Sequence, residues 1–478
     1  MELVIVGAHH AQMPLVLREQ VAIAATELPT TLAALDTIAS EGFILSTCNR
    51  TEIVALVDDA ATGTAALTGL LATVAVTTPA TIAPYLHMSV GTAATERLLM
   101  IAAGLDSMVL GEDQILAQSK GALAAAATAG TLGPVMHRLS AAALTTGKRA
   151  RAETPLGRGN LSVVSVALRE AQEALGGLRD RHVLIVGAGD TGELALKHLL
   201  KNSREQPASI AITNRTAARA TAAAAHHNVV ALPWAERAAA LADADLVLCC
   251  TAAPGTVLTR VDVADALAAR PARPLVCLDL AVPRDIDPEV ATLPGVLLRD
   301  VDALAPICAA ARVQRQDAIA AAQVSVAEEV ARFDTWWRAR AIAPMIAALR
   351  EQVTALGEAE VRRTLDRLPD LSARDTAIVR GLATSLVNKL LHAPTVALRT
   401  SGDGEALAQA ATALFGLEAE RAAPAPATLQ SAVSWCGTNE QRQDLPTSTA
   451  HTAQAVTPPR DEERWATTPQ ATVLAGRA

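Results

Sequence analysis

The feature that most constrains this chain is a glycine-rich turn between an apolar run and a helical run. The turn reads Gly187, Ala188, Gly189, Asp190, Thr191 and Gly192. Residues 183–186 (VLIV) precede it, and residues 193–200 follow with helical character. In this context the first glycine of G-x-G-x-x-G makes the tight turn, the second admits a pyrophosphate, and the third packs helix on strand. We predict a dinucleotide site here; a purely structural glycine turn is the alternative.

The same alternation of strand and helix continues along the middle of the chain. Apolar runs lie at 183–186, 210–213, 246–250, 275–280 and 296–298, separated by alanine-rich stretches. Regular alternation of this kind predicts a parallel, doubly wound, Rossmann-like sheet. We assign residues 151–304 to this domain.

The end of the second strand indicates which dinucleotide is bound. NAD sites usually carry an acidic residue there, which binds the ribose hydroxyls. This chain instead has Asn214, Arg215 and Thr216, with Arg219 one turn later. An arginine and a hydroxyl suit a 2′-phosphate, so we predict NADPH as the cofactor.

Three further segments complete the predicted α/β multidomain organisation. Residues 1–150 alternate strand-like runs at 4–6, 43–45 and 53–57 with helices, which predicts a small α/β (α+β) domain. One long helix is predicted from about 306 to 340, a bend at Pro344, and further helices within a domain over 305–418. Residues 419–478 lack periodicity and are rich in Ala, Pro, Thr and Gln, which predicts a disordered tail.

The predicted long helix carries one apolar stripe, formed by Ile319, Val326, Val330, Phe333 and Trp337. Their spacing keeps all five on one helical face. Since nothing nearby in the sequence covers this face, the stripe favours dimerisation; packing within the chain is the alternative.

Composition excludes several classes of protein. Lys plus Arg total 41 against 49 Asp plus Glu, a net charge of −8, which argues against a surface that grips nucleic acid throughout. Hydrophobic residues make up 51%, which excludes disorder of the whole chain. The N-terminus has no basic region typical of a signal peptide, and the six cysteines form no C-x-x-C pair. We predict a reduced cytoplasmic protein without a metal site or membrane span.

A second candidate site surrounds Cys48, which follows an apolar run in Ser46-Thr47-Cys48-Asn49-Arg50. Polar neighbours and an arginine are expected to lower the pKa of a thiol, as a nucleophile requires. A buried, inert cysteine is the alternative. Downstream, Ser107, Gly111, Gln114 and Gln118 would share one face if their segment is helical, as the lining of a polar pocket or as a solvated face.

Several separate motifs in order make the chain similar to the glutamyl-tRNA reductase family over roughly residues 1–418. They are residues 46–54 (STCNRTEIV), 104–118 (GLDSMVLGEDQILAQ), the glycine turn, 214–216 (NRT), 279–288 (DLAVPRDIDP) and 388–395 (NKLLHAPT). The resemblance implies a catalytic domain, an NADPH domain, and a helical dimerisation domain joined through a long spinal helix. It also implies reduction of glutamyl-tRNA(Glu) to glutamate-1-semialdehyde, the first step of tetrapyrrole synthesis, through a cysteine thioester.

The resemblance carries over to individual residues. Cys48 occupies the nucleophile position, and Arg50 is the expected partner of the glutamate carboxylate. The remaining substrate positions match Thr47, Asn49, Ser107, Glu112, Asp113, Gln114 and Gln118. The implied partners are the charged tRNA, a second copy of the chain and the downstream aminomutase.

One departure concerns proton transfer. The family usually has histidine ten residues before the serine matched by Ser107, and here Arg97 stands there. Arg97 is therefore a candidate catalytic residue that cannot itself exchange a proton. His10 and His87 are spare imidazoles in the same domain. A catalytically silent paralogue that binds charged tRNA or the aminomutase is the alternative to an active reductase, and an ordinary NADP dehydrogenase explains only the middle domain.

Overall fold

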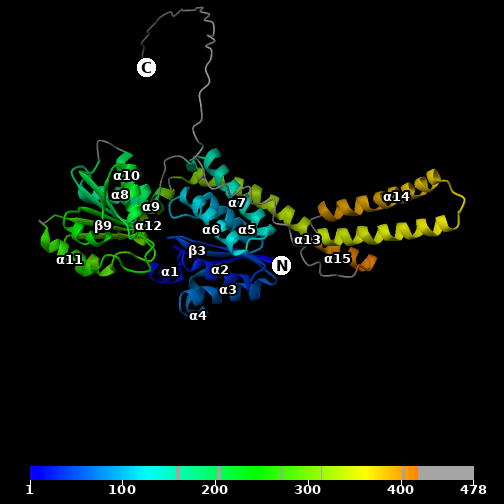
Figure 1. Ribbon diagram of the computed structural model, residues 1–478, viewed down its shortest axis with the longest axis horizontal. Helices are drawn as coiled ribbons and strands as arrows, with labels where there is room; N and C mark the ends of the chain where they lie inside the picture. Colours follow the sequence, from blue (N-terminus) through cyan, green and yellow to red (C-terminus); the bar gives the residue numbers. More distant parts are fainter. Residues whose placement is uncertain (158–161, 202–205, 271–272, 314, 401–403, 418–478) are drawn as a thin grey trace, which may run out of the picture. The chain divides into compact units, whose positions relative to one another are not determined.

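The computed structural model describes residues 1–157, 162–201, 206–270, 273–313, 315–400 and 404–417 (Figure 1). All of them belong to one unit, Met1–Ala423. The predicted tail at 419–478 lies outside the described residues.

The N-terminal part is built on a four-stranded antiparallel sheet in the order β2-β3-β1-β4. Its strands are β1 (Glu2–His9), β2 (Glu41–Ser46), β3 (Arg50–Val57) and β4 (Leu86–Val90). The three predicted strands are confirmed. β4 was not predicted, because His87 and Ser89 interrupt its apolar residues and only Leu86 is buried.

Helices cover this sheet and enclose one core. They are α1 (Leu15–Val21), α2 (Leu28–Asp36), α3 (Ala60–Val74), α4 (Pro79–Ile82), η1 (Ala83–Tyr85), α5 (Thr92–Ala103), α6 (Gln114–Ala129) and α7 (Pro134–Glu153). α3 and α5 pack on β1, while α2 and α6 pack on β2. The β1–β3 pair is buried along nearly its whole length, so this sheet is a rigid base for the loops at its ends.

The middle part is a six-stranded parallel sheet in the order β10-β9-β8-β5-β6-β7, as the Rossmann-like prediction requires. Its strands are β5 (His182–Val186), β6 (Ser209–Thr213), β7 (Val230–Leu232), β8 (Leu246–Cys249), β9 (Leu275–Asp279) and β10 (Val296–Asp300). The longer helices are α8 (Val163–Leu175), α9 (Asp190–Lys201), α10 (Ala217–His227), α11 (Arg260–Ala269) and α12 (Val301–Val313). Strand order reverses beside β5, where open α/β sheets bind their ligands.

The C-terminal helices are α13 (Gln316–Asp366), α14 (Ala373–Thr400) and α15 (Gly404–Phe415). The prediction of a single helix over 306–340 is wrong at both ends. α12 ends at Val313, and α13 continues for 51 residues through Pro344. Pro344 is exposed, so the carbonyl that loses its helical partner can be solvated, and the helix tolerates the ring. α14 packs back along α13 (Figure 1).

The apolar stripe of α13 lies against the N-terminal part of the chain. Val326 and Phe333 belong to the core of that part, and Ile319, Val330 and Trp337 pack against it. The prediction that this stripe mediates dimerisation is wrong, and packing within the chain is confirmed. Sequence proximity could not reveal this, because the covering helices α5 and α7 lie far away in the chain.

Among the described helices, none is by itself both long and apolar enough to cross a membrane, although α3 and the Pro79–Tyr85 segment pass together as a pair bent by 96°.

Candidate active site

Cys48 lies at the tip of a three-residue connection between β2 and β3. The last pair of the ladder is Ser46 with Thr51, and the backbone N–H of Thr47 donates to the carbonyl of Arg50 at 2.8 Å. The Thr47 hydroxyl accepts from the N–H of Asn49 at 3.2 Å, which fixes the turn. Cys48 as a whole residue is partly exposed there, whereas its thiol group is enclosed by the surrounding protein, and the rigid strands on both sides define its position.

The surroundings of Cys48 do not activate its thiol. Burial raises the pKa of Cys48 to about 12, the Glu112 carboxylate raises it further, and the nearby charges of Arg18 and Arg50 only partly oppose this. The prediction that Arg50 lowers the pKa of this thiol below its ordinary value is therefore wrong. Desolvation of the thiol therefore outweighs the charges of the two nearby guanidinium groups.

Asn49 supplies an unused acceptor beside Cys48. The residue is buried, and its Oδ1 has no hydrogen-bond partner among the described residues. Buried polar atoms are nearly always bonded, so an orphaned oxygen in a loop is suited to a donor on a ligand.

Arg50 is held in a buried network of charges. Its Nη1 donates to Oδ2 of Asp106 at 2.9 Å and lies 3.5 Å from Oε1 of Glu52, and its Nη2 donates to the Asp106 carbonyl. The Nε2–H of His9 donates to the same carbonyl at 3.0 Å. Arg50 therefore already has a carboxylate partner inside the protein.

Glu52 is the centre of that network and is fully buried. Its carboxylate is contacted by Nε2 of His87 at 2.7 Å and Nη2 of Arg97 at 3.0 Å. Burial by itself would raise the pKa of Glu52, but the His87 hydrogen bond and the charges of Arg97 and Arg50 hold it below its ordinary value. Sequence reasoning missed Glu52, although it follows Arg50 by two positions and therefore faces the same side of β3.

Arg97 projects from α5 into this network. Besides Glu52, its Nη2 lies 3.2 Å from Nδ1 of His87 and 3.5 Å from Oδ2 of Asp106. A guanidinium only donates, so Nδ1 of His87 accepts and its Nε2–H donates to Glu52. His87 is thus fully engaged. The other spare imidazole, His10, is kept neutral because burial lowers its pKa to about 3.

The segment between α5 and α6 is a closed loop. The polar face predicted for this segment required it to be a helix. The N–H of Gly111 donates to the carbonyl of Gly104 at 2.9 Å, and both glycines have positive φ, 72° and 77°. Residues other than glycine adopt these backbone angles only with strain. Helix α6 begins only at Gln114, so the predicted face of Ser107, Gly111, Gln114 and Gln118 is wrong.

The loop places the predicted substrate residues at different depths. Ser107 and Glu112 are buried, Gln114 is half-buried, and Asp113 and Gln118 are exposed. Asp113 pairs with Nε of Arg151 at 3.0 Å. Burial raises the pKa of Glu112 to about 7, opposed by a hydrogen bond from the Val163 backbone and by nearby arginines. A cavity of about 110 Å³ lies at residues 110–114 and extends to Leu194 and His198 of α9.

The glycine turn has the geometry predicted for a dinucleotide. A Cβ on Gly187, whose φ is 122°, would lie 2.8 Å from the carbonyl oxygen of Cys250, and one on Gly192 would meet the Gly187 carbonyl at 2.1 Å. A Cβ on Gly189 would meet nothing within 4 Å. Gly187 and Gly192 therefore serve packing, whereas Gly189 leaves open space at the start of α9. Oδ1 of Asn214 accepts from the N–H of Ala188 at 3.2 Å, which ties the turn to the end of β6.

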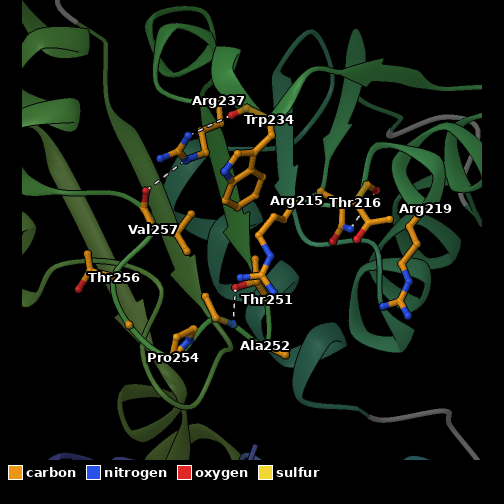
Figure 2. Close-up of a pocket in the computed structure, with 13 residues that line it drawn as sticks. Arg215, Thr216, Arg219, Trp234, Arg237, Thr251, Ala252, Pro254, Thr256 and Val257 are labelled. Atoms are coloured by element: carbon orange, nitrogen blue, oxygen red, sulfur yellow. Dashed lines mark hydrogen bonds between the residues drawn. The ribbon is translucent and has the colours of Figure 1, made fainter. Parts of the chain in front are cut away.

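A cavity of about 470 Å³ opens beyond β6, and Figure 2 shows the side chains around it. Its lining includes Asn214, Arg215, Thr216, Arg219, Trp234, Arg237 and residues 251–257. None of these described residues carries a carboxylate, and three are arginines, so the cavity suits an anion. Arg237 stacks on the Trp234 ring at 4.7 Å and donates to the carbonyls of Trp234 and Val257. Sequence reasoning missed Trp234 and Arg237, which lie outside any motif.

Two buried carboxylates hold the loop on the other side of this cavity. Asp285 accepts from the N–H and hydroxyl of Thr251 at 2.6 and 2.5 Å. Asp279 accepts from the N–H groups of Ala281 and Ile286. Burial raises the pKa values of Asp285 to about 6 and of Asp279 to about 7. Within the described part of the chain, no group of three His, Cys, Asp or Glu side chains could hold a metal ion.

Three family models match consecutive stretches of the chain between residues 6 and 417. Residues 6–154 match the model described as "Glutamyl-tRNAGlu reductase, N-terminal domain", 169–307 match "Shikimate / quinate 5-dehydrogenase", and 321–417 match "Glutamyl-tRNAGlu reductase, dimerisation domain".

Two relatives that cover 87% and 88% of this chain carry the same family name. A protein of Roseiflexus castenholzii named glutamyl-tRNA reductase is 44% identical over 418 residues, covering 87% of this chain and 97% of its own. One of Herpetosiphon aurantiacus with the same name is 44% identical over 420 residues, covering 88% and 100%. A solved glutamyl-tRNA reductase from Methanopyrus kandleri is 27% identical, with a TM-score of 0.47 over 87% of this chain and 99% of that one.

Proposed function

The chain belongs to the glutamyl-tRNA reductase family, and from this premise we propose how its residues divide the work of the reaction. It is an oxidoreductase that converts glutamyl-tRNA(Glu) to glutamate-1-semialdehyde. The relatives favour this activity over a silent paralogue, and the dehydrogenase-like middle domain supports a nicotinamide cofactor. The observation that carries the proposal is the position of Cys48, partly exposed at a rigid strand connection beside an orphaned acceptor.

The first half of the proposed reaction forms a thioester on Cys48. The Sγ–H proton passes to Glu112, an Sγ–C bond forms at the aminoacyl carbonyl, and the ester C–O bond to the tRNA ribose breaks, with the ribose oxygen taking up that proton. Oδ1 of Asn49 accepts from the ammonium group of the glutamyl residue, and Thr47 shapes the turn. Arg50 binds the side-chain carboxylate of the substrate's glutamyl residue, which replaces one of the hydrogen bonds that Arg50 makes to Asp106.

The second half reduces the thioester. When bound, NADPH would supply the hydride that reduces the thioester carbonyl carbon, and Cys48 would be returned as the thiolate when the C–S bond breaks and the aldehyde is released. The fit of this cofactor is supported by the open approach at Gly189 and by Arg215 and Thr216 in a cavity that suits a 2′-phosphate. The division into domains at 1–150, 151–304 and 305–418 forms part of the proposal.

Labelled substrate tests both halves. Incubation of the full chain with [14C]glutamyl-tRNA and no cofactor should leave label on the protein in a bond cleaved by hydroxylamine. NADPH should then release the label as the semialdehyde. Cys48→Ser should retain none, because a serine hydroxyl is far harder to deprotonate than a thiol, while the matched variant Cys277→Ala should behave like the parent. Label retained through a hydroxylamine-sensitive bond on Cys48→Ser contradicts the assignment.

We further propose a homodimer formed through α14. Ile378, Leu382, Leu386 and Leu390 recur every four residues and are each 58–69% exposed, and this region matches a dimerisation domain. An apolar stripe of this length is covered when two copies associate. Sedimentation of Leu382→Glu should show a monomer, and a dimer would contradict this surface. Association with the aminomutase and a cytoplasmic location stay predictions.

A further inference from the structure

Helix α1 contacts both the Cys48 loop and the cofactor-binding part of the chain. Arg18, only 1% exposed, donates from Nε to the carbonyl of Cys48 at 3.2 Å and from Nη1 to that of Met13 at 3.0 Å. Its Nη2 donates to Oδ1 of Asp302 at 2.6 Å, and Oδ2 of Asp302 accepts from the N–H of Leu15 at 3.1 Å. One guanidinium therefore bridges the nucleophile's backbone and a carboxylate of α12.

The next residue of α1 makes a second connection. Both carboxylate oxygens of Glu19 accept from Arg284, through Nε and Nη2 at 2.8 Å each, and Oε1 also accepts from the Arg284 backbone N–H at 2.7 Å. A forked pair of this kind fixes orientation as well as distance. Glu19 and Arg284 are mostly buried, with side chains 15% and 20% exposed.

Both residues that α1 contacts lie at the carboxyl ends of strands in the parallel sheet of the middle part. Asp302 lies in the first turn of α12, which directly follows β10. Arg284 follows β9 in the loop whose Asp285 holds Thr251, a residue that lines the arginine-rich cavity. These are the carboxyl ends of parallel strands, where dinucleotides bind. In Figure 1, α1 lies where the N-terminal part meets the middle part.

We propose that α1 is a positioning element for the reduction step, in which Arg18 and Glu19 hold the acylated Cys48 in register with the cofactor-binding domain. The inference rests on the proposed function, because it presumes a thioester on Cys48 and hydride transfer from the middle domain. Thioester formation uses residues of the N-terminal domain alone, so it does not need the Glu19–Arg284 pair. Reduction needs both domains at a fixed separation, since reacting atoms must meet within about 3–3.5 Å.

Single-turnover kinetics separates the two steps. The thioester is first formed on the full chain without cofactor, and NADPH is then added rapidly. In Glu19→Gln and Arg284→Gln, thioester formation should stay within about twofold of the parent, whereas reduction should slow at least about tenfold, since small misplacements of reacting groups are costly. The NADPH dissociation constant, measured by fluorescence titration, should change less than about threefold, because neither residue lines the cavity.

Charge reversal distinguishes positioning from a merely structural role. The double variant Glu19→Arg with Arg284→Glu should recover part of the reduction rate that each single variant loses. Glu170→Gln is the matched control, because it removes an ion pair with Arg299 of similar length, 3.0 Å, within the middle domain alone. It should reduce the thioester at the parent rate.

The outcomes divide clearly. Reduction at the parent rate in both single variants overturns the inference, and so does an equal loss in both steps, since α1 would then act on Cys48 alone. If Glu19→Gln fails to fold, Arg284→Gln and Asp302→Asn test the same contacts from the other side. Failure of the parent chain to form any thioester would instead refute the proposed function.

Discussion

The buried thiol of Cys48 should react slowly with a small electrophile in the free protein. Burial raises its pKa to about 12, against 9.0 for an ordinary cysteine. At pH 8 the thiolate fraction is then lower by about 1,000-fold, while the greater nucleophilicity of a more basic thiolate recovers about 20-fold, at a Brønsted slope of about 0.45. The net expectation is alkylation about 50-fold slower than that of an ordinary thiol.

Iodoacetamide alkylation followed by mass spectrometry measures this rate. Trypsin should release residues 19–50 as one fragment in which Cys48 is the only cysteine. The logarithm of the rate should rise linearly with pH from 7 to about 10, without a plateau, because the thiol does not titrate in this range. The same fragment alkylated in urea-unfolded protein is the control. A midpoint below pH 9 in the folded protein would refute the argument that desolvation dominates this site.

Three further predictions concern other parts of the chain. Burial raises the pKa of Glu112 to about 7 and its charge acts on Cys48, so we expect Glu112 to accept the thiol proton. Thioester formation should then increase with pH through a midpoint near 7, and Glu112→Gln should remove that dependence; a midpoint that persists contradicts the assignment. NADPH should be preferred to NADH at least about tenfold in kcat/KM, since a charge-assisted contact from Arg215 is worth about 1.5–3 kcal/mol, and equal use of both is the contrary result. Truncation after Leu417 should leave a folded, active dimer by sedimentation and assay, because the sequence beyond it lacks a core pattern; an inactive or monomeric product contradicts this.

Features that depend on local sequence could be predicted, whereas those that depend on residues from distant elements meeting in the fold could not. The turn at Gly187 and the end of β6 at Asn214 are local, because each follows an apolar strand at a fixed offset. The network at Glu52 gathers residues from β3, β4 and α5, so no periodicity in one element identifies it. The raised pKa of Cys48 depends on burial of its thiol, which the polar residues next to it in the sequence do not indicate.

The same distinction explains the long helices. The stripe on α13 could be read from spacing alone, but what covers it depends on the distant helices α5 and α7. Pro344 resembles a helix end in sequence, and only its exposure in the fold shows why the helix continues. Trp234 and Arg237 line the arginine-rich cavity and follow β7, a strand too short and too exposed to be predicted.

Arg97 stands where the resemblance to the family implies a histidine, and the structure gives this difference two separable consequences. Its guanidinium neutralises the fully buried Glu52 at 3.0 Å. Removing one partner from such a pair leaves an uncompensated charge, so Arg97→Gln should lower the free energy of unfolding by about 3 kcal/mol, the low end for buried pairs because Glu52 keeps His87 and Arg50. A urea titration followed by circular dichroism measures this loss.

The second consequence concerns the pH profile of turnover. A guanidinium stays protonated at every pH at which the protein is folded, so Arg97 adds no limb near pH 6–7 to the rate of the parent chain. Arg97→His should add a second limb in this range, beyond the one expected of Glu112, and should raise turnover, because an imidazole can exchange a proton there. Arg97→Lys, which keeps a fixed charge, is the matched control and should add no limb. If Arg97→His and Arg97→Gln both keep the rate and pH profile of the parent while losing stability, Arg97 serves only to neutralise Glu52, and its assignment to catalysis is wrong.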